Sequence, residues 1–231
     1  MSASVPLIVP GFDMAGTSLY RARLGGDYYD FLRPAGGGDG RLAVAVGDVA
    51  GHDAIAGGLM RIVRACLRAQ PAQPGRLGAL MEGINRDFSG RVAAGRFMTL
   101  FLAVLVAGTR NIHWVSAGHG PAMAYDPAAD RFDEVQGLDI PLGIDPQWRY
   151  HELAHSGWSP GTLLVVGTDG ITEARNRSGD MYGRDRLCDV VRASASACAD
   201  DIMRAVTTDV GAFRQGRPAQ DDLTIVVVKA V

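Results

Sequence analysis

Apolar positions follow two patterns along the chain. Short runs rich in β-branched residues predict strands at 27–32, 42–48, 97–106, 111–116, 121–125, 162–167 and 223–228. Apolar residues three and four positions apart predict helices at 51–68, about 77–88, 184–192 and 200–213. On the first of these helices the predicted apolar stripe is Ile55, Leu59, Ile62, Val63 and Cys66.

The order of these elements predicts an α+β fold. Strands come in clusters that helix pairs interrupt, which favours packed sheets with helices outside over alternating βαβ units. Glycine-rich residues 34–40 predict a hairpin loop, and residues 137–160, rich in Gly, Pro, Trp and His, predict a flap or long loop over a site. We expect one domain over 1–231, with 1–10 as an irregular lead-in, because no repeat or long linker divides the chain.

Acidic residues stand beside several of the apolar runs. They are Asp27, Asp48, Asp169 and the pair Asp221 and Asp222. An ionised carboxylate beside a buried strand is costly, and several that converge would repel one another. A divalent cation offsets this repulsion, and oxygen ligands without a Cys/His cluster favour Mg²⁺ or Mn²⁺ over zinc. The pattern therefore predicts a metal-dependent hydrolase.

Composition narrows the class of protein. The chain has 231 residues, of which 47% are hydrophobic, and a net charge of −2, so no global basic field favours nucleic acid or anionic membranes. The three cysteines form no CxxC pair, which fits a reducing compartment. The start lacks signal-peptide features, and the longest apolar stretch, 97–108, is shorter than the ~20 residues of a membrane helix. We expect a soluble, cytoplasmic protein.

Several short motifs occur in an order that is typical of one family. They are Gly25-Gly26-Asp27-Tyr28-Tyr29-Asp30-Phe31, Gly47-Asp48-Val49-Ala50-Gly51-His52, Met98-Thr99-Leu100-Phe101-Leu102-Ala103-Val104-Leu105, Ala117-Gly118-His119-Gly120-Pro121, Pro141-Leu142-Gly143-Ile144, Thr168-Asp169-Gly170-Ile171-Thr172-Glu173-Ala174 and Asp221-Asp222-Leu223-Thr224. Together they resemble the PPM family of metal-dependent serine/threonine protein phosphatases, in particular its bacterial SpoIIE/RsbU branch.

The resemblance implies a fold, a chemistry and a site. The fold would be a sandwich of two stacked antiparallel sheets flanked by helix pairs. The activity would be hydrolysis of phosphoserine or phosphothreonine by metal-activated water, with two Mn²⁺ or Mg²⁺ ions. Asp48 would bridge the ions and the Val49 carbonyl would bind one of them. Asp27, Asp169 and Asp221 would supply the other carboxylates, with Asp48 and Asp169 as the catalytic pair.

The resemblance also implies partners. The substrate would be a small phosphorylated anti-sigma-factor antagonist of the STAS type in a partner-switching pathway. A regulatory partner or a dimer is possible in such a pathway. Neither a nucleic acid nor a membrane is expected as a partner.

Alternatives remain open at the level of residues and of function. Asp222 is the alternative to Asp221, because adjacent residues at a strand end point in opposite directions. His52 stands four residues after Asp48, where the eukaryotic members have a histidine after two, so no general acid is carried over. His52 and His119 are interpreted as structural. Rival functions are a non-catalytic phosphatase-like binding or sensing domain and a nucleotide cyclase, the latter suggested by Gly25-Gly26-Asp27.

Overall fold

The computed structural model describes most of the chain. The described residues are 9–21, 25–32, 41–51, 54–70, 72–92, 95–109, 111–120, 122–156 and 158–231. The elements in chain order are β1 (Phe12–Leu19), β2 (Asp27–Leu32), β3 (Arg41–Val49), α1 (Ala54–Ala69), α2 (Leu77–Ser89), β4 (Met98–Val106), η1 (Ala107–Thr109), β5 (Asn111–Ala117), β6 (Ala122–Asp126), β7 (Arg131–Glu134), β8 (Leu153–Ser156), β9 (Leu163–Gly167), α3 (Asp169–Thr172), α4 (Gly183–Ser194), α5 (Ala199–Phe213) and β10 (Leu223–Ala230). The predicted hairpin loop at 34–40 and His52 lie outside the described residues.

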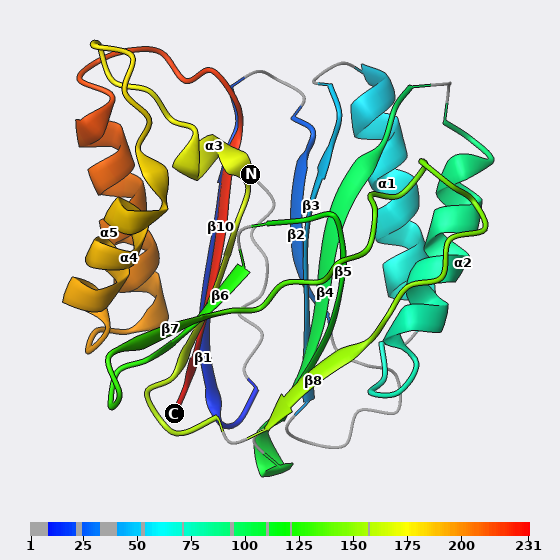
Figure 1. The fold of residues 1–231 in the computed structure, drawn as a ribbon, viewed down its shortest axis with the longest axis horizontal. Helices are drawn as coiled ribbons and strands as arrows, with labels where there is room; N and C mark the ends of the chain where they lie inside the picture. Colours follow the sequence, from blue (N-terminus) through cyan, green and yellow to red (C-terminus); the bar gives the residue numbers. More distant parts are fainter. Residues whose placement is uncertain are drawn as a thin grey trace.

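Two five-stranded sheets are stacked face to face (Figure 1). One has the strand order β1-β10-β9-β6-β7 and the other β2-β3-β4-β5-β8, and the named strands pair antiparallel throughout. Helices α4 and α5 cover the outer face of the first sheet, and α1 and α2 cover that of the second. The predicted α+β sandwich with flanking helix pairs is confirmed.

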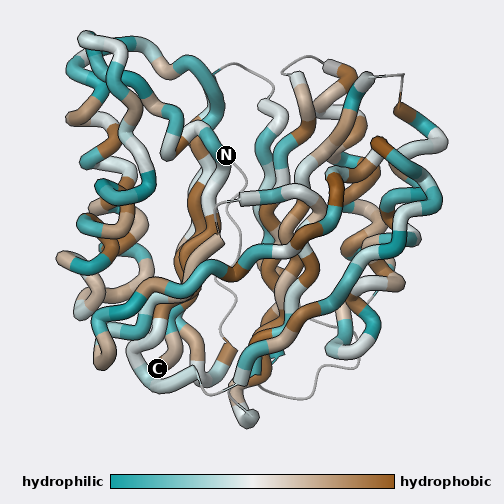
Figure 2. The backbone as a smooth tube through the Cα atoms, viewed as in Figure 1, coloured by the Kyte–Doolittle hydropathy of each residue, from teal (hydrophilic) through white to brown (hydrophobic). Residues whose placement is uncertain are grey.

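Three apolar layers hold the sandwich together. The central one lies between the sheets and includes Phe101, Val166 and Val226, all fully buried. The other two lie between each sheet and its helix pair. Figure 2 shows the hydrophobic positions along the strands and the more hydrophilic ones on the outer helix faces and loops. Each large apolar side chain buried in this way contributes roughly 1.5–3 kcal/mol.

Helix α1 packs most of the predicted stripe on the core, with Ile62 and Cys66 partly buried there. Leu59 and Val63 are buried as expected, but Ile55 is 55% exposed. Ala56 and Leu67 complete the buried face instead. The packed face therefore includes one neighbouring position at each end of the predicted stripe, and Ile55 lies outside it.

Of the predicted flap or long loop at 137–160, the long loop is confirmed, since residues 137–152 form no helix or strand, but the loop is packed down and is not a free flap. Much of this segment packs against α2, where Leu142 and Tyr150 are buried in the core. Asn85 of α2 fixes it, since its Nδ2 donates to the carbonyl of Asp145 at 2.7 Å and its Oδ1 accepts the N–H of Gly143 at 2.9 Å. Residues near the end of the segment form β8, which extends the second sheet.

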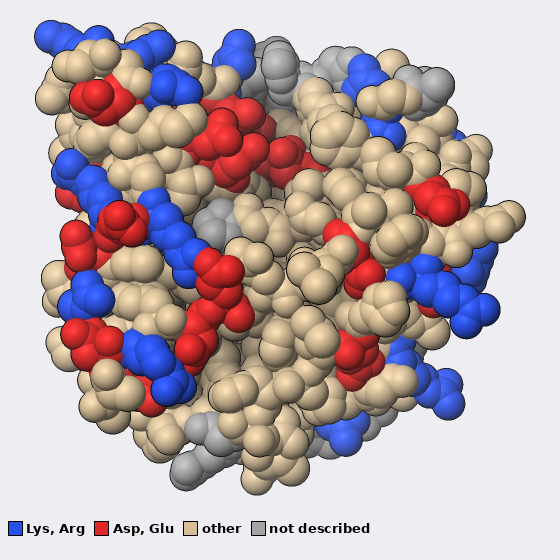
Figure 3. Space-filling model, viewed as in Figure 1, with Lys and Arg blue, Asp and Glu red and all other residues tan. Residues whose placement is uncertain are grey.

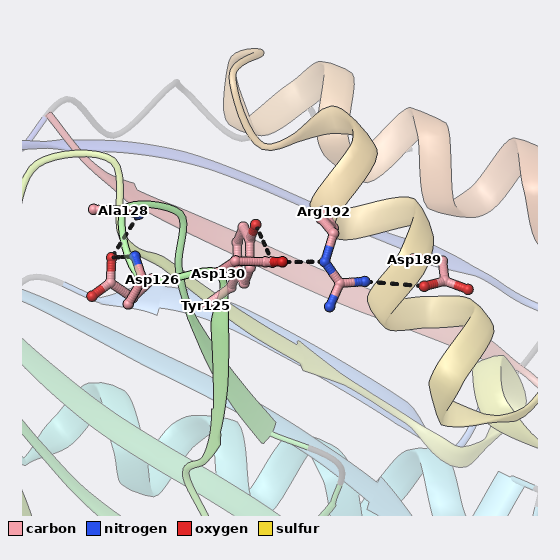
Figure 4. Close-up of polar contacts among 7 residues, drawn as sticks. Tyr125, Asp126, Ala128, Asp130, Asp189 and Arg192 are labelled. Carbon is pink, nitrogen blue, oxygen red and sulfur yellow. Dashed lines mark hydrogen bonds and ion pairs between the residues drawn. The ribbon is translucent and has the colours of Figure 1, made fainter.

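Polar contacts tie α4 to the edge of the first sheet (Figure 4). Arg192 of α4 donates to Asp130 in the turn between β6 and β7 at 2.7 Å and to Asp189 on its own helix at 3.0 Å. The hydroxyl of Tyr125 donates to the same carboxylate of Asp130 at 3.0 Å. An exposed ion pair alone stabilises little, so the shared carboxylate mainly fixes where the helix meets the turn.

Candidate functional site

The first two acidic residues face each other across neighbouring strands. The apolar run of β3 is fully buried up to Val46, and Asp48 follows at the end of the strand. Asp27 of β2 is its register partner and is 2% exposed. Asp27 Oδ2 accepts a hydrogen bond from Thr168 Oγ1 at 2.8 Å, and that hydroxyl also accepts the N–H of Thr224 at 3.0 Å. Asp27 of one sheet is therefore held by two segments of the other.

The other acidic residues come from the first sheet. Asp169 follows β9 and begins α3, and Asp221 lies just before β10. Asp222 is buried, and its carboxylate accepts the backbone N–H groups of Arg21 at 2.6 Å and Gly26 at 3.1 Å. Asp222 thus anchors the chain in front of β2, whereas the exposed Asp221 is the member of the pair that lines a surface hollow together with Asp169.

Backbone oxygens approach the carboxylates at Gly26. A Cβ atom added there would lie 2.7 Å from the Val49 carbonyl oxygen, 2.8 Å from that of Gly51 and 3.0 Å from Asp48 Oδ1. Only glycine leaves room for these three oxygens to gather around one point. The Val49 carbonyl oxygen and the Asp48 carboxylate thus both lie close to Gly26.

The carboxylates raise one another's pKa values. Burial is the largest cause for Asp27, whose pKa rises to about 7, with repulsion from Asp48 adding to it. Burial likewise raises the pKa of Asp48 to about 6, and repulsion from Asp169 and Asp221 adds to it. The pKa of Asp169 is raised by burial and by Asp221. The four predicted carboxylates, which come from both sheets, are therefore close enough to repel one another, and a bound cation would reduce this repulsion.

The donor set fits a hard divalent cation. Figure 3 shows acidic side chains gathered at the upper edge of the molecule, between the two halves of the sandwich. The gathered donors are carboxylate and carbonyl oxygens, which suit Mg²⁺ or Mn²⁺. Across the described ranges, no three or more His, Cys, Asp or Glu side chains are grouped closely enough to hold one ion by themselves. Mg²⁺ fits such an open set, because it usually keeps several of its waters and takes one or two carboxylates.

Comparison with known proteins identifies the family. The sequence profile of Stage II sporulation protein E (SpoIIE) matches residues 38–231. The chain belongs to the SpoIIE family. The profile covers Asp48, Asp169 and Asp221, while Asp27 lies before its start. The Gly25-Gly26-Asp27 run that suggested a cyclase is, in this SpoIIE-family chain, the entry into β2.

Individual relatives agree with the family. Phosphoserine phosphatase RsbU of Bacillus subtilis is 23% identical over 94% of this chain and 63% of its own length. The chain spans less than two thirds of the curated relatives it matches. Among solved structures, the SiaA-PP2C domain of Pseudomonas aeruginosa has a TM-score of 0.79 at 20% identity and covers 94% of this chain and 86% of that one. RsbX in complex with magnesium has a TM-score of 0.73 at 13% identity, covering 97% and 98%. These likenesses show the fold.

Sequence reasoning found the carboxylates but missed what holds them. Thr168, Thr224 and the amide-binding role of Asp222 follow from contacts between distant segments, although Thr168 and Thr224 stand within the matched motifs. His119, interpreted from the sequence as structural, is buried, and its Nδ1 lies 2.9 Å from Thr99 Oγ1. Among the helices in the described part of the chain, none is long and apolar enough to cross a membrane.

Proposed function

We propose that this SpoIIE-family chain is a metal-dependent protein serine/threonine phosphatase. The observation that carries the proposal is the convergence of Asp27, Asp48, Asp169 and Asp221 from two sheets on one edge. Burial, together with repulsion from neighbouring carboxylates, raises the pKa values of Asp27, Asp48 and Asp169. Homology to a relative named phosphoserine phosphatase supports the activity. A non-catalytic binding domain would not need to keep four mutually repelling carboxylates together.

Each residue has a part in holding two Mn²⁺ or Mg²⁺ ions. Asp48, the Val49 carbonyl, Asp27, Asp169 and Asp221 would supply the protein ligands. When bound, the ions neutralise a phosphate group and lower the pKa of a water molecule so that it can attack phosphorus.

The surrounding chain keeps these ligands in place. Thr168 fixes the orientation of the Asp27 carboxylate by its hydrogen bond. Asp222 holds the backbone of Arg21 and Gly26, so the turn that leads into Asp27 stays against the other sheet. The pre-arranged oxygens reduce the reorganisation that binding an ion and a phosphate would need.

The substrate is proposed from the family. RsbU is named a phosphoserine phosphatase, and a structurally similar chain with a TM-score of 0.65 comes from the bacterial stressosome. These likenesses support a phosphorylated protein substrate, and we propose a small STAS-type anti-sigma-factor antagonist in a partner-switching pathway. A separate regulatory protein or a second copy of the chain would complete the pathway.

The test is release of phosphate from a phosphoserine peptide. We expect turnover with Mn²⁺ or Mg²⁺, loss of turnover with EDTA, and recovery when either ion is returned in excess. Ca²⁺ should restore it poorly, because Ca²⁺ prefers more ligands at longer distances. The variant Asp169→Asn should lose activity, while Asp133→Asn, on the exposed strand β7, serves as the matched control. Full activity in EDTA would rule out the metal-dependent mechanism.

A further inference from the structure

A hollow opens directly beside the acidic edge. Its volume is about 510 Å³, including the solvent in its mouth. Asp169 and Asp221 line one side, and Glu173, Arg175 and Arg214 are among the other lining residues. Because two proposed metal ligands belong to its wall, anything bound at the metals would have its neighbouring atoms in or next to this hollow. We refer to it below as the arginine hollow.

Among the described residues, the two arginines of the hollow have no carboxylate partner. The buried Nε of Arg214 makes no hydrogen bond. Arg175 donates only to the carbonyl of Gly179, at 2.8 Å. Over the described residues, neither guanidinium pairs with a carboxylate, whereas Arg186 and Arg192 elsewhere pair with acidic side chains. A partly buried guanidinium without an anion is an incomplete site, since Arg is suited to bidentate binding of carboxylate or phosphate.

The two loops that carry these arginines are fixed to each other. Arg214 caps the end of α5, with its N–H bonded to the Val210 carbonyl at 3.1 Å. Arg217 reaches from the same turn to the carbonyl of Asn176 at 2.9 Å, in the loop that follows Arg175. Figure 3 shows basic side chains over this corner, beside the acidic patch. The segments that carry Arg175 and Arg214 are therefore held in a fixed position relative to each other.

We propose that the arginine hollow is a subsite for a carboxylate side chain that flanks the phosphorylated residue of the substrate. This rests on the proposed phosphatase function and names a substrate feature for the same site. A phosphate at the acidic edge would sit at Asp169 and Asp221, so the hollow beyond them would receive a neighbouring residue. Consecutive residues of an extended peptide are at most about 3.6 Å apart, so that residue lies within a few positions of the phosphoserine.

The charges that line the hollow predict substitutions that lower the preference for an acidic peptide and others that raise it. Arg175 and Arg214 attract a carboxylate, and the exposed Glu173 repels it; Asp169 and Asp221 would repel it too, unless bound metal offsets their charge. Removing either guanidinium should weaken the preference for acidic neighbours. Removing the Glu173 charge should strengthen it. A purely structural role for these residues would not change preference in both directions.

The experiment compares two phosphoserine peptides that differ only in Asp or Gln at the flanking positions. The measured quantity is the ratio of kcat/KM for the acidic over the neutral peptide, with Mn²⁺, in the wild type, Arg175→Gln, Arg214→Gln and Glu173→Gln. We expect a ratio of about ten or more in the wild type, as for a charge-assisted hydrogen bond. It should fall toward one in both arginine variants and rise in Glu173→Gln. Arg204→Gln, on the exposed face of α5, is the matched control and should keep the wild-type ratio.

Equilibrium binding of the same two peptides separates this inference from the phosphatase assignment. If no peptide is hydrolysed, the proposed function fails, but the ratio of the two dissociation constants still reports on the hollow. A wild-type ratio of one, or a ratio that the arginine substitutions leave unchanged, would overturn the subsite. Equal losses for both peptides and for a small aryl phosphate would also overturn it, because the arginines would then bind the phosphoryl group itself.

Discussion

At the scale of single residues, one buried histidine joins the two sheets below the acidic edge. The Nδ1 of His119 contacts Thr99, the register partner of Asp48, and the carbonyl of Gly167 lies near the ring from the other sheet. Its Nε2 is buried and makes no hydrogen bond with any residue that the structure describes. Such a group is stable only as the neutral imidazole, because no anion is there to offset a charge.

Burial lowers the pKa of His119 to about 4, and this sets a pH dependence of stability. The unfolded chain, with a pKa of about 6.5, takes up the proton first, so stability is lost as the pH falls from 6.5 toward 4. Between pH 7 and pH 4.5 we expect the wild type to lose about 2 kcal/mol more free energy of unfolding than His119→Gln. Denaturant titrations at both pH values measure this, with His155→Gln, on the exposed strand β8, as the control. Equal losses in wild type and His119→Gln would contradict the neutral, buried assignment.

At the scale of elements, the site depends on how closely the turn before β2 approaches the end of β3. Gly26 allows this approach, because a side chain there would meet two carbonyl oxygens and the Asp48 carboxylate. Helix α1 offers a contrast, since a Cβ at Gly58 would meet no atom within 4 Å. The same substitution should therefore have opposite effects at the two positions.

We predict that Gly26→Ala destabilises the protein by about 1–3 kcal/mol, as overpacking does, and weakens Mn²⁺ binding. Gly58→Ala should stabilise it by about 0.5–1 kcal/mol, because alanine restricts the unfolded chain and favours a helix. Thermal melting with and without Mn²⁺ measures both effects. A Gly26→Ala protein that melts and binds Mn²⁺ like the wild type would show that the gathered oxygens are not part of the site.

At the scale of the whole molecule, the sequence predicts features that depend on neighbouring residues and misses those that depend on contacts between distant segments. Buried strands such as β3 and β9 are continuous apolar runs, so their positions were evident. Strand β1 was missed, because its half-buried residues give a weak pattern and its stability comes from pairing with β10. The carboxylates could be found because motifs mark them. The arginine hollow could not, since Arg175 and Arg214 are far apart in sequence and meet only when α5 packs.

The proposed metal site depends on the whole molecule, because its ligands come from both sheets. If Asp48 lies at the centre of a shared metal site, Asp48→Asn should affect metal binding and metal-free stability in opposite ways. The loss of a ligand weakens binding. The loss of its charge removes repulsion, and since burial and neighbouring carboxylates raise the pKa of Asp48 to about 6, the gain should be larger at pH 8 than at pH 5.

The most direct test is a calorimetric titration of Mn²⁺ into the metal-free protein, followed by thermal melting of the same samples. We predict saturable binding to the wild type, binding at least about tenfold weaker in Asp48→Asn, and a higher metal-free melting temperature for that variant at pH 8. Asp133→Asn should bind as the wild type does. If Asp48→Asn bound Mn²⁺ with wild-type affinity, the acidic edge would not be the metal site and the account would be wrong.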